Sequence, residues 1–388
     1  MSDVRYLGMP LENEELARTE YNSGKTVLES LPTVVTFALT TLCNNRIPCV
    51  ICDRNTRPPY GDIDTNEQVI EAVKPLLKTA TYVLLHCGGE PFFSKNFDNV
   101  ASMIMPPTRV SFATNAMLLT KARTDRLLER DIMAGFVVSM DAATPEIYRI
   151  MRPSCNFNTV INNIRYYTQK AEALGREHSS VILNMTLCQS NICDAPKFVD
   201  LAASVGAKCV DYNHLNKGLS HTVKTADGMD WNYGEQADFE DASFHNQMVM
   251  EAYNRAKEHG IHMMFVGKPF LGPDADKIDP SIISELCGGV PFQESEEHIW
   301  KSEHHKLLAP NVPPCFKPWR ETVIQPNGEV RECYFHELGD WKTGDILKDD
   351  FMAIWNSTAM IRERQQFLKN AFSKRCSVST PCVHRQRQ

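Results

Sequence analysis

Short apolar segments alternate with amphipathic segments from residue 33 to about residue 215, and this alternation constrains the fold most. The segments between the apolar ones place apolar residues at helical spacing, as Val69, Ile70 and Val73 do. Near-continuous apolar strands separated by helices indicate a parallel sheet covered by helices. The predicted strands cover residues 33–41, 81–87, 109–115, 134–141, 181–187 and 207–215. The sequence therefore predicts an α/β fold, a partial (β/α)6 TIM-like barrel.

The pattern loosens after residue 215. The polar stretch KGLSHTVKTADGMDWNYGEQAD is typical of a loop or lid, and a helix over about 240–259 and a strand at IHMMFVG follow it. The Pro-rich segment APNVPP, residues 309–314, indicates a domain boundary. We expect four parts: an N-terminal extension (1–32), the partial barrel (33–215), a connecting or lid segment (216–308) and a small C-terminal domain (309–388).

The charge balance argues against a nucleic-acid partner. Lysine and arginine number 41 against 48 acidic residues, which gives a formal net charge of −7. No apolar run approaches the ~20 residues that span a bilayer, and the first residues are too acidic and polar for a signal peptide. We expect a cytoplasmic protein without a nucleic-acid or membrane partner.

Thirteen cysteines are many for a cytoplasmic chain, where they act as metal ligands, catalytic thiols or core residues more often than in disulfides. One group is Cys43, Cys49 and Cys52, in LTTLCNNRIPCVICDRN. Three thiolates are too few for a structural zinc site, which needs four protein ligands. On a four-iron cluster they would leave one iron free to bind another molecule. The alternatives are a zinc loop completed by a distant residue such as His86, or a plain Cys-rich turn.

Polar motifs follow several of the predicted strands, at the end where parallel barrels place functional residues. The first strand ends in the cysteine triad and the second in CGGEP, residues 87–91. The third ends in TN and the fourth in SMD, residues 139–141, while Asn184 lies within the fifth.

Together these motifs resemble the radical S-adenosylmethionine (SAM) superfamily, and specifically its members with a C-terminal SPASM or twitch domain. The triad, GGEP and the segment SMDAATPEIYRIMRPSCNFNTVINNI carry the resemblance. One departure is the spacing C-x5-C-x2-C, where C-x3-C-x2-C is commonest in the superfamily. It leaves open how residues 44–48 lie over the cluster.

The resemblance implies a role for each matched residue. Cys43, Cys49 and Cys52 would hold a 4Fe-4S cluster, and SAM would bind the fourth iron. Thiolates suit such clusters. Arg152 would bind the SAM carboxylate, for which its planar guanidinium is suited, with Arg149 as a nearby competitor. The remaining candidates for SAM, ribose or substrate contacts are Ile51, Gly88, Gly89, Glu90, Asn115, Ser139, Asp141 and Asn184.

The C-terminal cysteines resemble a SPASM domain through C-x12-G-x4-C, from Cys315 through Gly328 to Cys333. Cys376 and Cys382 would complete four thiolates for one auxiliary 4Fe-4S cluster. A structural zinc site with four cysteines is the alternative. His336 and His384 could replace a ligand, although we expect them at the surface.

The resemblance implies an enzyme, a radical SAM oxidoreductase or epimerase. It would cleave SAM to a 5′-deoxyadenosyl radical and take electrons from an external donor such as flavodoxin or ferredoxin. We expect a polar small-molecule substrate: a sugar, aminocyclitol or nucleotide-sugar that is dehydrogenated or epimerised. The alternatives are modification of a ribosomal peptide, by Cα epimerisation or crosslinking, and a non-catalytic zinc-binding protein. Cys287 is the candidate catalytic hydrogen donor, whereas Cys87, Cys188 and Cys209 are expected in the core.

Overall fold

The protein is described here from a computed structural model. The structure describes residues 10–55, 61–85, 88–176, 178–216, 221–287, 315–333, 342–369 and 371. The chain divides into two compact units. One unit holds Met1–Leu42, Tyr60–Phe112 and Gln293–Gln388, and the other holds Cys43–Pro59 and Ala113–Phe292. Each unit has its own sheet, and each is described by itself.

The second unit is built on a parallel sheet with the strand order β10-β7-β6-β5-β4. Its strands are β4 (Ala113–Thr114), β5 (Phe136–Ser139), β6 (Val181–Leu187), β7 (Cys209–His214) and β10 (His262–Val266). The last strand extends the predicted parallel series by one member, because β10 pairs with β7.

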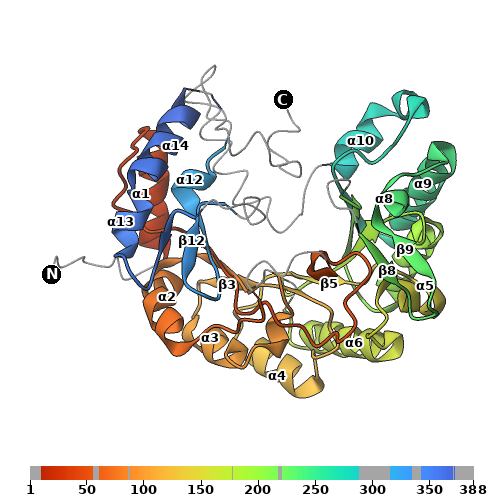
Figure 1. The fold of residues 1–388 in the computed structure, drawn as a ribbon, viewed down its shortest axis with the longest axis horizontal. Helices are drawn as coiled ribbons and strands as arrows, with labels where there is room; N and C mark the ends of the chain where they lie inside the picture. Colours follow the sequence, from red (N-terminus) through yellow and green to blue (C-terminus); the bar gives the residue numbers. More distant parts are fainter. Residues whose placement is uncertain are drawn as a thin grey trace. The chain divides into compact units, whose positions relative to one another are not determined.

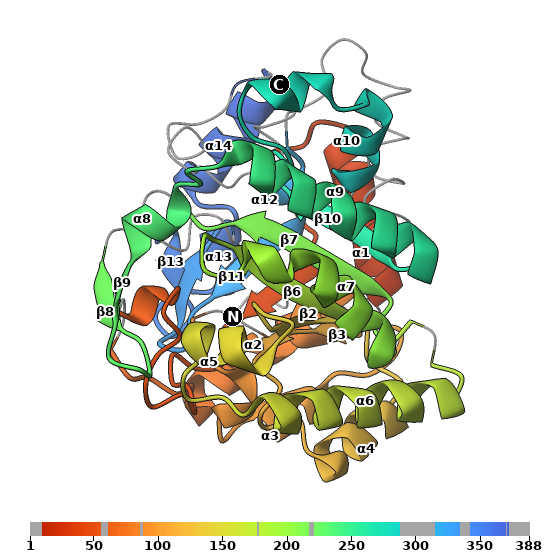
Figure 2. The ribbon, with the colours of Figure 1, turned by 90° about the vertical axis from the view of Figure 1, so that its right-hand side faces the viewer.

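Helices follow the strands of this unit as the alternation predicts. The helices are α4 (Lys121–Glu129), α5 (Pro145–Met151), α6 (Phe157–Ala173), α7 (Ala195–Ser204), α8 (Tyr233–Ala237), α9 (Ala242–His259) and α10 (Pro280–Leu286). Figure 2 shows α7 in front of β6 and β7. Tyr212 of β7 reaches this helix layer, where its hydroxyl donates to Ala195 O at 2.7 Å and its ring packs edge-on against Phe198.

The polar stretch after β7 contains regular structure that the sequence does not indicate. The antiparallel strands β8 (Thr222–Lys224) and β9 (Asp230–Asn232) form a hairpin, and α8 follows it directly. Trp231 and Tyr233 are buried there, in an apolar cluster with Val50, Met151 and Leu215.

The first unit holds a sheet with the order β13-β12-β11-β1-β2-β3. Its strands are β1 (Val34–Phe37), β2 (Tyr82–Leu84), β3 (Arg109–Ser111), β11 (Glu321–Ile324), β12 (Glu329–Arg331) and β13 (Gly344–Asp345). β11 pairs in parallel with β1, from Val34 opposite Glu321 to Phe37 opposite Ile324. The first strand of the chain and a strand near its C-terminal end therefore lie side by side.

The described residues of this unit form the helices α1 (Pro10–Asn22), α2 (Glu67–Thr79), α3 (Phe97–Met103), α12 (Lys317–Arg320), α13 (Phe351–Trp355) and α14 (Thr358–Leu368). The described 3-10 turns of the whole chain are Asp53–Asn55, Pro91–Phe93, Ile192–Asp194 and Pro273–Lys277. Tyr21 of α1 packs edge-on against Trp319 of α12, with ring centroids 5.3 Å apart. Both residues belong to one apolar core with Trp355, Met360 and Phe367. Figure 1 shows α1, α12, α13 and α14 gathered together in this unit.

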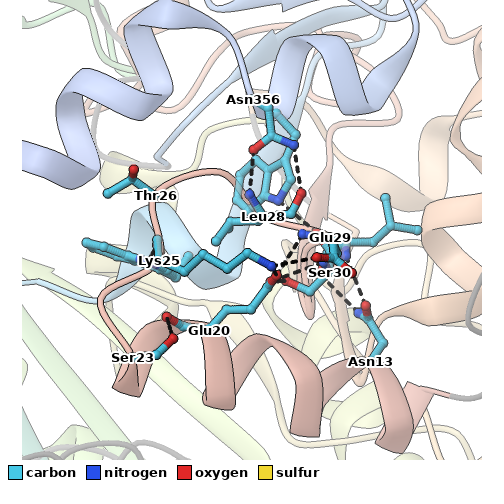
Figure 3. A network of polar contacts seen from close by, with 12 residues as sticks. Asn13, Glu20, Ser23, Lys25, Thr26, Leu28, Glu29, Ser30 and Asn356 are labelled. Carbon is cyan, nitrogen blue, oxygen red and sulfur yellow. Dashed lines mark hydrogen bonds and ion pairs between the residues drawn. The ribbon is translucent and has the colours of Figure 1, made fainter.

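Polar contacts fasten the segment that follows α1. Figure 3 shows Glu20 accepting hydrogen bonds from Glu29 N, from Ser30 N and Oγ, and from Lys25 Nζ. The side chain of Asn356 donates to Leu28 O and accepts from Leu28 N, both at 2.8 Å. The residues expected as a plain N-terminal extension thus include a helix that is integral to this unit.

The predicted α/β fold class is confirmed. This class does not require the strands to close into a complete barrel. The expected boundary at residues 309–314 lies outside the described residues. In the described part of the chain, no helix is long and apolar enough to span a membrane.

Candidate functional site

The cysteine triad lies on a loop of the second unit that runs from Cys43 to Cys52. Cys49 is buried, and Cys43 and Cys52 are half-buried. The end of the loop is a tight turn in which Cys52 N donates to Cys49 O at 3.0 Å. The side chain of Asn55 donates to the carbonyl oxygens of Cys49 and Cys52, at 2.9 and 3.0 Å. These contacts fix the backbone that carries the last two cysteines.

Nitrogen donors surround two of the three sulfurs. Asn45 N lies 3.5 Å and Asn115 Nδ2 3.8 Å from Cys43 Sγ. Asn45 Nδ2 lies 3.3 Å and Arg152 Nη1 3.5 Å from Cys49 Sγ. An N–H group directed at a sulfur stabilises a thiolate, which is the form of cysteine that binds metals.

Arg152 is held by a buried ion pair with Asp141. Arg152 Nε donates to Asp141 Oδ2 at 2.8 Å, and Asp141 Oδ1 accepts from Thr186 N at 2.9 Å. Burial alone would lower the pKa of Arg152, but the Asp141 carboxylate outweighs it, and the pKa lies above its ordinary value. Asp141 has a φ of 60°, a conformation that costs energy outside glycine and is maintained here by its contacts. The pair places a permanent cation against Cys49.

The last residue of α5 and the residues after it hold the triad loop through hydrogen bonds. Val50 N donates to Met151 O at 3.1 Å, and Ile47 N donates to Ser154 Oγ at 2.9 Å. Ser154 Oγ donates back to Ile47 O at 3.0 Å. The segment MRPSC, residues 151–155, therefore lies alongside the loop over most of its length.

The donor set of this loop fits an iron–sulfur cluster. Three thiols lie on one loop, a guanidinium cation and amide N–H groups approach their sulfurs, and Asn115 is buried beside them. Among the described residues, no three Cys, His, Asp or Glu side chains converge as ligands of a single ion. A four-iron cluster binds each cysteine to a different iron, so its ligands lie farther apart than those of one ion.

The GGEP motif belongs to the first unit and packs against the residues just before Cys43. A Cβ atom on Gly89 would lie 2.4 Å from Leu42 O and 2.5 Å from Thr40 O, so only glycine fits. Gly88 has a φ of +78°. Glu90 is buried, its backbone N donates to Leu42 O at 2.8 Å, and Oε1 accepts from Phe92 N. The close approach to the backbone explains Gly89, and the positive φ explains Gly88.

The inner face of the second unit's sheet is layered. Because Tyr212 points to the helices, Asp211 and Asn213 point to the opposite face. Its first layer includes the apolar residues Val137, Ile182 and Cys209. Toward the carboxyl ends of the strands, polar side chains replace them: Ser139, Asn184, Thr186, Asp211 and Asn213.

Asp211 is a residue of this polar layer that the sequence analysis does not single out. Its Oδ2 accepts from Asn184 Nδ2 at 3.1 Å, whereas the buried Oδ1 has no hydrogen-bond partner among the described residues. Burial raises the pKa of Asp211 to about 7, although the Asn184 bond lowers it. An acidic residue between the buried residues Val210 and Tyr212 of β7 was the available signal. Asn184 is thus placed as a partner of Asp211 and of Asn213 Oδ1.

The other candidate residues take separate positions. Ile51 is half-buried against the cluster around Val50 and Met151. Cys287 follows α10, and its thiol donates to Gly267 O, just beyond the carboxyl end of β10. Cys188 and Cys209 are buried, as expected for core residues.

Of the C-terminal cysteines, the structure describes only two. Cys315 is buried in the core of the first unit, and Cys333 is half-buried after β12. Burial raises the pKa of Cys315 above its ordinary value. Cys376 and Cys382 lie outside the described residues, as do Cys87 and His86.

A cavity of about 590 Å³ lies at the other end of the second unit's sheet. It is lined by residues such as Val181, where β6 begins, and Lys208, just before β7. This is the amino end of the strands, away from the polar layer, so the cavity is not part of the candidate site.

Comparison with protein families identifies two domains. Residues 37–201 match the radical SAM superfamily model, and residues 315–382 match SPASM, an iron–sulfur cluster-binding domain. The chain therefore carries a radical SAM domain and a C-terminal SPASM domain, as the sequence predicts. Its cofactors are SAM and iron–sulfur clusters.

Two curated proteins and one solved structure illustrate the similarity. The chain is 20% identical over 360 residues to AlbA, the antilisterial bacteriocin subtilosin biosynthesis protein of Bacillus subtilis, covering 91% of this chain and 66% of AlbA. It is 29% identical over 118 residues to a probable GTP 3′,8-cyclase of Methanosarcina mazei, covering 29% of this chain and 34% of that protein. SuiB of Streptococcus suis, bound to its precursor peptide SuiA, aligns with a TM-score of 0.56 at 15% identity over 91% of this chain and 70% of SuiB. The chain thus spans less than two thirds of the length of either curated relative.

Proposed function

We propose that this radical SAM enzyme modifies a peptide, by abstracting a hydrogen atom from it to give an epimerised or crosslinked product. The observation that carries the proposal is the similarity to AlbA, which extends over 91% of this chain. SuiB, which shares the fold, is bound to a precursor peptide. The cyclase match covers only 29% of the chain, so it says less about the substrate of the whole protein. The peptide alternative is therefore better supported than the small-molecule substrate expected from the sequence.

In this proposal Cys43, Cys49 and Cys52 hold the SAM-binding cluster. Bound together, the cluster and SAM supply the 5′-deoxyadenosyl radical that abstracts hydrogen from the substrate. The clamp by Met151 and Ser154 holds the loop in place, and the Arg152–Asp141 pair places a positive charge at Cys49. Gly88, Gly89 and Glu90 would bind the SAM amino group through the backbone, which the close packing of Gly89 against Thr40 and Leu42 holds in place.

The polar layer of the second unit's sheet is the proposed substrate-facing surface. Ser139, Asn184 and Asp211 occupy neighbouring positions across β5, β6 and β7. Side chains that both donate and accept hydrogen bonds suit a peptide backbone, whose amide groups require both kinds of partner. SPASM residues Cys315, Cys333, Cys376 and Cys382 would hold the auxiliary cluster, and an external flavodoxin or ferredoxin would supply electrons.

The experiment is a substrate screen with the reconstituted protein under anaerobic conditions. Peptides encoded by short reading frames beside the gene are compared with sugars, aminocyclitols and nucleotide-sugars. We expect a peptide to stimulate 5′-deoxyadenosine formation. Mass spectrometry should then detect loss of a hydrogen pair for a crosslink, or deuterium uptake from D2O at a Cα for epimerisation. Cys49→Ala is the negative control. Turnover of a sugar-type compound with no modified peptide would contradict the proposal.

Cys287 is the proposed hydrogen donor if the product is an epimer. Its thiol lies just beyond the carboxyl end of β10, the end of the strands where the polar layer lies. Cys287→Ala should then abolish the epimerised product while SAM cleavage continues. Full epimerisation by this variant would remove Cys287 from the mechanism.

A further inference from the structure

The triad loop is two residues longer than the commonest superfamily spacing, and Asn45 lies in the longer segment. Its side chain is only 4% exposed, although the neighbouring residues Asn44 and Arg46 are more accessible. A buried amide must satisfy both its N–H groups and its oxygen inside the protein. The partners of Asn45 therefore indicate why it is buried.

Asn45 contacts three different sulfur atoms. Its backbone N lies 3.5 Å from Cys43 Sγ, and its side-chain Nδ2 lies 3.3 Å from Cys49 Sγ. Its Oδ1 accepts a hydrogen bond from Cys155 Sγ at 3.1 Å. Because Cys155 engages the oxygen end of the amide, the nitrogen end is directed at Cys49.

The position of Cys155 is itself fixed. Cys155 N donates to Arg152 O at 3.0 Å, and the neighbouring Ser154 is hydrogen-bonded to Ile47 in both directions. Cys155 is thus an orienting group for Asn45.

Hydrogen bonds to the sulfurs of a cluster ligand favour the more negatively charged, reduced state, and they raise the reduction potential. We propose that Asn45, oriented by Cys155, is a positioning residue whose amide N–H stabilises the Cys49 thiolate and raises the reduction potential of the SAM-binding cluster. The longer loop then provides its own donor to a cluster ligand. This proposal depends on the triad holding the cluster, and it does not depend on the nature of the substrate.

The test is a redox titration of the reconstituted protein, followed by electron paramagnetic resonance. The relevant cluster is identified as the one whose signal changes when SAM is added. Asn45→Leu removes the donor at similar size, and Asn45→Gln retains an amide. Ile47→Ala is the matched control in the same loop, because Ile47 is 54% exposed and its hydrogen bonds with Ser154 are made by its backbone.

We expect Asn45→Leu to shift the midpoint potential of this cluster downward at unchanged iron content, with Ile47→Ala at the wild-type value. Resonance Raman spectra should show an altered iron–cysteine stretch in Asn45→Leu. An unchanged midpoint in a fully loaded Asn45→Leu protein would overturn the proposal. If that variant does not load iron, Asn45→Gln decides: loading with a near-wild-type midpoint supports the proposal, and any other result overturns it. Persistence of the SAM-responsive signal in Cys49→Ala would instead refute the triad assignment.

Discussion

Asp211 should make the stability of this protein fall as the pH rises. Its pKa is raised from 3.8 to about 7, chiefly by burial. Between these two values the unfolded chain releases the proton while the folded chain retains it. A shift of about three pKa units corresponds to roughly 4 kcal/mol. The loss of folding stability caused by ionising Asp211 is absent below about pH 4 and complete above about pH 7.

Asp211→Asn removes the titrating group and retains a side chain of similar shape. We therefore expect the variant to gain stability relative to wild type by up to about 4 kcal/mol between acid and mildly alkaline pH. Urea unfolding at about pH 5, 6.5 and 8 measures the difference in midpoint. Ser139→Ala is the matched control, because it changes a polar side chain of the same layer without a carboxyl group. If the difference in urea midpoint between wild type and Asp211→Asn is the same at all three pH values, the reasoning is refuted.

Three further predictions concern other contacts. Arg152→Leu leaves the buried Asp141 carboxylate unpaired and should cost about 3–5 kcal/mol, seen as a lower melting temperature; an unchanged melting temperature would contradict the ion pair. Gly89→Ala places a Cβ 2.4 Å from Leu42 O and should impair SAM cleavage, measured as 5′-deoxyadenosine, whereas wild-type cleavage would argue against the tight turn. Glu20→Gln should cost about 1–3 kcal/mol at neutral pH. Burial opposes ionisation of Glu20, but its hydrogen bonds outweigh burial and hold its pKa below 4.5. The cost of Glu20→Gln should therefore shrink as acid protonates the wild-type carboxylate, and a cost that does not change with pH would contradict this prediction.

The parallel strands could be predicted because their apolar runs are continuous and the helices between them are periodic. The segment VILNMTL, for example, is β6 from Val181 to Leu187. Helix α1 could not be predicted in the same way, because two of its buried residues, Asn13 and Glu20, are polar. They are buried through hydrogen bonds to Leu31 and Ser30, which no local periodicity records.

The candidate site was predictable as a set of motifs but not as an arrangement. The triad and the SMD segment could be read from the sequence, whereas the clamp of residues 151–155 on the triad loop depends on tertiary contacts. Asn45 and Cys155 lie 110 positions apart in the chain, so their contact has no local signature. The pairing of Arg152 with Asp141 likewise joins the end of α5 to the residues after β5.

The most direct test of the account is the iron content of the chain with and without the three cysteines near residue 50. After anaerobic reconstitution we expect about eight irons per chain, in two four-iron clusters, together with conversion of SAM to 5′-deoxyadenosine under reduction. The triple variant Cys43→Ala, Cys49→Ala and Cys52→Ala should retain only about four irons and form no 5′-deoxyadenosine. Undiminished iron in the triple variant, or continued cleavage of SAM, would contradict the central claim.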